Sequence, residues 1–164
     1  SRPIRIESEP PMRSPIERQL AYHVEHCRMR RVSEGRALEV FPGTYLRPRW
    51  PERLTCSIDC GPGWTDLIEG LNEVLDLWGA EGRFDGIKEK FGLLRLSWFG
   101  DDQGGRIDEL TDAAEEISAM ICERCGRRGM LRSTRAGGGW LSTSCEEHAV
   151  PGSSVVRAKS EGWL

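Results

Sequence analysis

The stretch GWTDLIEGLNEVLDLWG, residues 63–79, carries the clearest folding pattern in the chain. Its large apolar residues recur three or four positions apart, which places them on one face of a helix. They are Trp64, Leu67, Ile68, Leu71, Val74, Leu75 and Trp78. We therefore predict an amphipathic helix that packs against the core and ends at a glycine, Gly79 or Gly82.

Two further helices are predicted on either side of this one. In the first, Ser14 can cap the helix, Pro15 suits the first helical position and Glu17 completes a capping box. Gly35 is expected to end it. The other, RIDELTDAAEEISAMI at residues 106–121, has apolar residues at helical spacing and leads directly into a cysteine.

Short strands are predicted between the helices. ALEVF at 37–41 and RLTCSI at 53–58 are strand-like, and Leu94, Leu96 and Trp98 alternate with less apolar residues. Lys88–Lys90 is interpreted as a solvated entry to that last strand. Residues 14–121 thus predict an α+β domain with two or three amphipathic helices and a short sheet. Residues 1–13 are predicted to be a mobile arm, and 151–164 a tail.

Composition limits the class of protein. The chain has 164 residues, 38% hydrophobic and 30% charged, with a net charge of −3, which suits one folded domain rather than disorder. No global basic field attracts nucleic acid, and no apolar run is long enough to cross a membrane. The start lacks a secretory signal, and six cysteines are too few for a disulfide scaffold. We expect a cytoplasmic protein with reduced thiols.

The segment 122–148 predicts a zinc ribbon. Cys122 and Cys125 are separated by two residues, Cys145 and His148 repeat that spacing, and nineteen residues lie between the two pairs. The intervening residues fit a hairpin with a glycine turn at 137–139, which would bring the pairs together. Three thiolates and one imidazole suit tetrahedral Zn²⁺, and four protein ligands leave no open position for water. We therefore predict a structural zinc site within a ribbon spanning 122–150.

A second metal site is a weaker hypothesis. His23 and His26 lie on the first predicted helix, and Cys56 and Cys60 precede the second. Neither spacing is the tight two-residue type, so we favour buried cysteines and solvent-facing histidines. No phosphate-binding loop or hydrolase motif is present, and no catalytic residue is predicted.

The ribbon also carries a local basic patch. Its cations and its aromatic residue could contact the phosphates and bases of DNA or RNA, although a solvated face is the simpler interpretation. These candidate contacts are Arg124, Arg127, Arg128, Arg132, Arg135 and Trp140.

Four segments together resemble a family of small uncharacterised proteins from bacterial and bacteriophage genomes. They are CGPGWTDLI (60–68), IKEKFGLLRL (87–96), CERCGRRG (122–129) and GGWLSTSCEEH (138–148). The resemblance covers about residues 56–150, and Leu93 replaces a glycine that the family usually carries. It implies zinc binding at the four ligands and a phage or prophage setting, and it supplies no catalytic residues.

Three functions remain open at this stage. The leading one is a zinc-stabilised, non-enzymatic binding module that contacts a host or phage macromolecule, with a protein the favoured partner. The second is a DNA- or RNA-binding protein that uses the ribbon arginines. The third is an enzyme with its site in the α+β domain.

Overall fold

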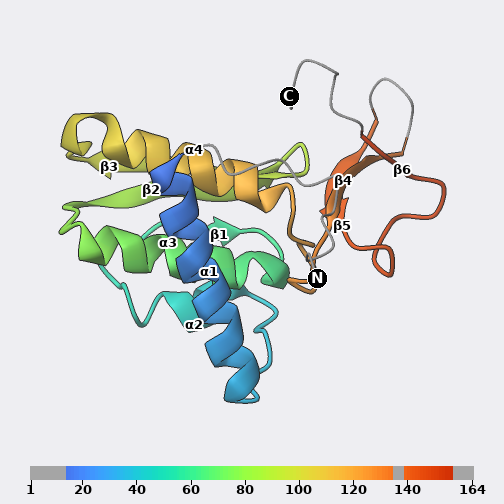
Figure 1. Ribbon diagram of the computed structural model, residues 1–164, viewed down its shortest axis with the longest axis horizontal. Helices are drawn as coiled ribbons and strands as arrows, with labels where there is room; N and C mark the ends of the chain where they lie inside the picture. The colour runs from blue at the N-terminus through green and yellow to red at the C-terminus, as the bar shows by residue number, and fades with distance from the viewer. Residues whose placement is uncertain (1–13, 135–138, 157–164) are drawn as a thin grey trace, which may run out of the picture.

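The computed structural model describes residues 14–134 and 139–156, and the predicted arm at 1–13 lies outside them. Within these ranges the chain is an α+β protein with two small sheets (Figure 1). The helices are α1 (Pro15–Ser33), α2 (Pro42–Leu46), α3 (Thr65–Leu77) and α4 (Arg106–Ser118), with 3-10 turns η1 (Pro62–Trp64) and η2 (Gln103–Gly105). The strands are β1 (Ile58–Asp59), β2 (Gly82–Lys90), β3 (Leu93–Gly100), β4 (Met130–Ser133), β5 (Leu141–Ser144) and β6 (Ser154–Val155).

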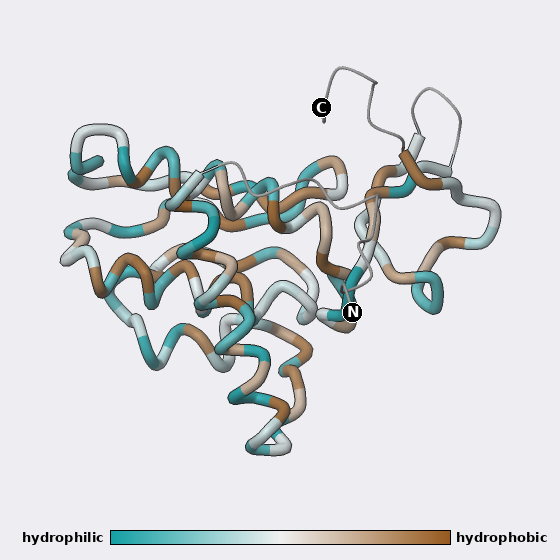
Figure 2. The backbone as a smooth tube through the Cα atoms, in the orientation of Figure 1, coloured by the Kyte–Doolittle hydropathy of each residue, from teal (hydrophilic) through white to brown (hydrophobic). Residues whose placement is uncertain are grey.

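Helix α3 lies at the centre of the core, as its apolar stripe predicts. Six of the seven stripe residues are buried, and Trp78 is partly buried against them. Helix α3 packs on α1 and α4, and brown and teal alternate along the helical turns in Figure 2. At its end, Gly79 adopts a φ of +62°, a left-handed conformation that stops the helix as predicted. The start of α1 is also confirmed, because Ser14 Oγ accepts the Glu17 backbone N–H at 3.1 Å.

The first sheet has the order β1-β2-β3. Strands β2 and β3 form an antiparallel hairpin, and β1 pairs in parallel with β2 through two residues. Helix α4 covers the free edge of β3: Ser118 Oγ and a Glu115 carboxylate oxygen accept the backbone N–H groups of Leu94 and Leu96. A side-chain cover of this kind keeps an exposed strand edge from pairing with another chain.

Two strand predictions are corrected by the structure. Residues 37–41 form no strand, and Pro42 and Gly43, which follow them, open helix α2. Val40 and Phe41 are both 72% exposed, so this alternating segment has no strand or core to pair with. Of 53–58, only Ile58 pairs in a strand, within β1.

The remaining differences concern element ends. Helix α4 ends at Ser118, three residues before the predicted end, and a turn leads to Ile121. Strand β2 begins at Gly82, well before the predicted entry at Lys88–Lys90, and β3 confirms the predicted strand around Leu94. Part of the predicted tail joins the ribbon, because β6 pairs with β4.

The second sheet, of order β5-β4-β6, lies at one end of the molecule in Figure 1. Strands β4 and β5 form the predicted hairpin, whose turn falls largely outside the described residues. Among the helices described, none combines the length and hydrophobicity needed to cross a bilayer.

Candidate metal centre

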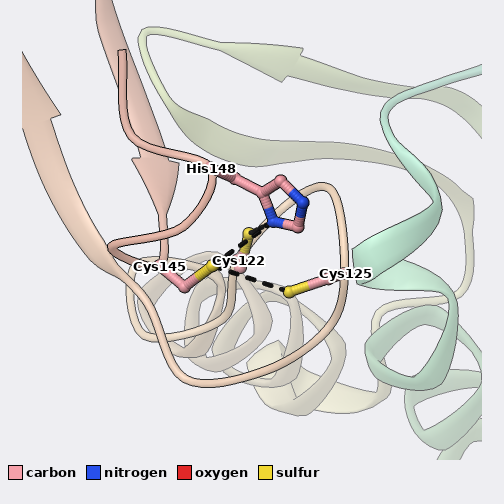
Figure 3. A group of neighbouring side chains, drawn as sticks. All are labelled: Cys122, Cys125, Cys145 and His148. Carbon is pink, nitrogen blue, oxygen red and sulfur yellow. Dashed lines mark hydrogen bonds between the residues drawn. The ribbon is translucent and has the colours of Figure 1, made fainter. Parts of the chain in front are cut away.

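Two tight turns carry the four predicted ligands. After α4, the Cys122 N–H donates to Arg127 O at 2.7 Å and Gly126 N–H donates to Cys122 O at 2.9 Å. Gly126 has a φ of +78°, which a side chain would disfavour, so the glycine after the second cysteine permits this reversal. After β5, the His148 N–H donates to Cys145 O at 3.2 Å. Each turn aims its two ligands toward the other turn (Figure 3).

The distances between the ligand atoms fit one tetrahedral zinc ion. Bonds of about 2.3 Å to sulfur and about 2.0–2.1 Å to nitrogen place two sulfurs about 3.8 Å apart, and a sulfur and a nitrogen about 3.6 Å apart. Cys125 Sγ and Cys145 Sγ are 3.8 Å apart. His148 Nδ1 lies 3.7 Å from Cys122 Sγ and 3.3 Å from Cys145 Sγ. All four ligand atoms lie within 4.8 Å of one another, so the residues could hold a metal ion.

Burial and charge at the site also suit a structural ion. Cys122 is buried and the other three ligands are partly buried. Burial alone would raise the pKa of Cys125, but hydrogen bonds, first among them one from Arg127, lower it to about 6. Burial raises the pKa of Cys122, and a bound cation would offset this by favouring its thiolate. Three sulfurs and a nitrogen with no fifth position form the donor set of a closed zinc site.

The first knuckle, Cys122–Gly126, is docked on the turn that precedes α3. Gly63 N–H donates to Glu123 O at 2.6 Å, and Gly61 N–H donates to the Glu123 carboxylate at 2.9 Å. The fully buried Trp64 donates its Nε1–H to Ile121 O at 2.9 Å. The candidate metal centre is therefore attached to the core helix through backbone groups and one tryptophan.

The tip of the β2–β3 hairpin is docked on the ribbon from another side. Thr143 Oγ1 donates to Gly92 O at 2.7 Å, and the Glu89 carboxylate accepts Gly92 N–H at 2.7 Å. A Cβ on Gly92 would lie 2.7 Å from a Leu131 methyl group, so this turn and the ribbon approach closely. The sequence analysis predicted neither the docking of the knuckle on the turn before α3 nor that of the hairpin tip on the ribbon, because each joins segments that are far apart in the chain.

The predicted nucleic-acid contacts are placed less favourably. Arg127 pairs with Glu147, and Arg132 Nε donates to Ser144 O at 3.1 Å. Arg124 and Arg128 are exposed, Trp140 is 68% exposed, and Arg135 lies outside the described residues. The ribbon patch therefore includes at least one arginine whose charge is already matched by a carboxylate.

The residues of the hypothetical second metal site do not come together as a ligand group in the part of the chain that the structure describes. His23 Nδ1 lies 3.3 Å from a Glu73 oxygen, and His26 stacks on Tyr22 with ring centroids 4.1 Å apart. Cys56 and Cys60 are partly buried beside the core.

An ion-pair network that joins α1 and the segment after α2 to α3 was not predicted. Carboxylates recur on α3 at a spacing that the sequence displays, and each meets an arginine: Asp66 with Arg31, Glu69 with Arg30 and Arg49, Glu73 with Arg30 and Arg49, and Asp76 with Arg53. Tyr45 OH also donates to Glu69, which has no exposed side-chain surface.

Part of this network resembles a metal site, since Cys27, Glu69 and Glu73 offer ligand atoms within 4.8 Å of one another. One nitrogen of Arg30 lies 3.6 Å from Cys27 Sγ and within 3.1 Å of both carboxylates. The guanidinium therefore already supplies the cation, and a divalent ion would be repelled by it. Burial also raises the pKa of Cys27, which disfavours its thiolate. We interpret this network as structural.

The network predicts a specific pH dependence of stability. Burial alone would raise the pKa of Glu73, but hydrogen bonds from Arg30 and His23 hold it below its ordinary value of 4.5. A depressed folded pKa gives stability that is present above the unfolded pKa and lost as pH falls through the folded one. The difference in unfolding free energy between wild type and Glu73→Gln should therefore be largest above pH ~4.5 and shrink toward lower pH. Urea unfolding of both chains across pH 3–7 would measure it, and a constant difference would contradict the assignment.

Comparisons with protein-family models, with characterised proteins and with solved structures gave no match. The site is therefore interpreted from its own geometry.

Proposed function

We propose that the chain is a zinc-stabilised, non-enzymatic binding module. The observation that carries this proposal is the tetrahedral spacing of Cys122, Cys125, Cys145 and His148. A closed set of four protein ligands gives zinc a structural role rather than a catalytic one. The ion would hold a ribbon that contacts both the turn before α3 and the tip of the β2–β3 hairpin.

The partner in this proposal is a host or phage macromolecule. The phage or prophage setting rests on the sequence resemblance alone. Large exposed side chains in the hairpin tip and ribbon, Phe91 at 64% and Trp140 at 68% exposure, support an interaction surface in this part of the molecule. An enzymatic function is less well supported, because the buried ionisable cluster at Glu69 is already filled by arginines.

Metal analysis tests the proposal directly. Protein purified without chelators should contain one zinc ion per chain, and Cys122→Ser should lose it, because a hydroxyl replaces one of the three thiolates. Cys56→Ser is the matched control and should keep the metal, since Cys56 lies outside the ligand group. Zinc-free wild type would overturn the proposal, and two ions per chain would reopen the second-site hypothesis.

A further inference from the structure

The outer face of the β2–β3 hairpin has an unusual composition. Side chains of Phe84, Ile87 and Leu94 enter the core, so their neighbours along each strand point away from it. The register pairs Arg83 with Phe99, Gly86 with Ser97, Lys88 with Arg95 and Lys90 with Leu93 on this opposite side. We define the hairpin face as the exposed residues Arg83, Lys88, Lys90, Phe91, Arg95 and Phe99.

Charge on this face differs from charge elsewhere in the protein. Two of its cations lie over aromatic rings: Arg83 is 4.4 Å from the Phe99 centroid, and Lys90 is 5.5 Å from the Phe91 centroid. Arg95 lies 3.9 Å from a Glu115 oxygen, the limit of an ion pair. By contrast, Arg30, Arg31 and Arg53, which contact α3, each have a carboxylate oxygen at 2.8 Å. The hairpin face therefore presents cations that remain available to an anionic partner.

Carboxylates near the face are fewer than its cations. Asp59 of β1 lies beside Lys88 in the register, and exposed Asp85 lies at the bulge of β2. With Glu115, which approaches Arg95, three acids stand against four cations, on a chain whose net charge is −3. The face is a local basic patch on an acidic protein.

Two features of the face are unfavourable for stability. Lys88 and Arg95 lie directly opposite each other, and like charges at such a cross-strand position are destabilising. Phe91 has a φ of +54° in the two-residue turn Phe91-Gly92, where asparagine would be favoured, and its ring is 64% exposed. Departures from local preference concentrate at functional sites.

We propose that the hairpin face binds single-stranded nucleic acid. This inference rests on the proposed binding function and names the partner. Phosphates pair with the lysines and arginines, and bases stack on the exposed rings of Phe91 and Phe99. Gly86 and Ser97 form a row of small side chains between the charged rows, where a strand can approach the sheet closely. A duplex fits less well, because its bases are stacked inside and do not reach the phenylalanines.

Binding of labelled oligothymidine and oligouridine of about 15 nucleotides, longer than most single-domain sites, tests the proposal. On single strands each phosphate contact contributes about −0.7 to the slope of log affinity against log salt, so four cations give about −3. The double variant Lys88→Gln/Lys90→Gln should flatten this salt-dependence slope by about 1.4, because two phosphate contacts are lost. The ribbon variant Arg124→Gln and the helix variant Arg18→Gln are matched controls and should leave it unchanged.

The variant Phe91→Asn separates binding from folding. Asn-Gly is the preferred sequence for this turn, so the melting temperature should rise. Loss of one stacked base should weaken binding by about 5- to 150-fold. A rise in stability together with this loss of affinity is a result that a purely structural role of Phe91 would not give.

Several outcomes would overturn the inference. One is that neither oligonucleotide binds at low salt. Another is that duplex DNA or polyglutamate binds as tightly as the single strands. A third is that only the Arg124→Gln variant loses affinity. The last would move the contact to the ribbon arginines, and binding of polyglutamate would indicate an acidic protein partner. Zinc content, measured on the same samples, is independent of all of these, so failure here leaves the zinc-stabilised module intact.

Discussion

Removal of zinc from the proposed module is expected to lower the thermal midpoint of the chain by about 8–16 °C. The ribbon strands β4 and β5 have four residues each, and Leu131 is their one buried hydrophobic residue. So little apolar surface does not stabilise a fold by itself, and in the proposed zinc module metal binding supplies the missing free energy. A ligand present at a thousand times its Kd contributes about 4 kcal/mol, and 1 kcal/mol shifts the midpoint of a chain of this size by about 2–4 °C.

Circular dichroism melts before chelation, after chelation and after zinc is restored would measure this change. Cys145→Ser should melt like the chelated wild type and should not respond to added zinc. Cys56→Ser keeps all four ligands and should melt like untreated protein. Hydrogen exchange should locate the loss first at the Glu123 N–H, which donates to Thr143 O at 3.0 Å across the ribbon. An unchanged midpoint after complete chelation would show that zinc does not hold the ribbon.

Local patterns in the sequence were enough to predict the Cys/His cluster and the three longer helices α1, α3 and α4. A two-residue spacing fixes how two ligands turn toward one point, and the second pair repeats it at Cys145 and His148. The stripe of α3 likewise depends only on helical geometry, so the burial of Leu71 follows from its neighbours at three and four positions.

Features that depend on distant partners could not be predicted in this way. Residues 37–41 alternate like a strand, but alternation does not provide a second strand, and Val40 remains exposed. The acidic positions on α3 are visible in the sequence, yet their partner Arg49 lies in a segment with no helical pattern. The ion-pair network is therefore a property of packing rather than of any one segment.

Four segments of the chain that the sequence analysis singles out, those beginning at Cys60, Ile87, Cys122 and Gly138, include residues that meet around the ribbon. The turn at Gly61–Trp64 contacts the first knuckle, and the tip at Phe91-Gly92 contacts β4 and β5. Each segment thus contains either ligands or groups that dock on the ligand-bearing turns. Their positions fit one physical requirement, which is the attachment of a small sheet to a larger core.

This attachment predicts that Gly63→Ala is severely destabilising. A Cβ on Gly63 would lie 2.0 Å from Cys122 O and 2.6 Å from Glu123 C, and backbone atoms of the knuckle cannot move aside as a flexible side chain can. The turn before α3 would have to separate from the knuckle, which breaks the 2.6 Å hydrogen bond from Gly63 N–H to Glu123 O. We expect the free energy of unfolding to fall by more than about 3 kcal/mol, the upper end of the usual cost of overpacking.

Gly86→Ala is the matched control for this substitution. Its Cβ would meet only Ser97 Cβ at 3.5 Å, an ordinary contact, so the expected change is below about 1 kcal/mol. Urea unfolding of both variants gives the free energies, and metal analysis of the folded protein separates docking from ligation. Because Gly63 supplies no ligand, its alanine variant should still bind one zinc ion while it unfolds at much lower urea concentration. Wild-type stability in Gly63→Ala would show that the knuckle does not rest on the turn before α3, and loss of zinc from it would show that the docked turn is needed to form the metal centre.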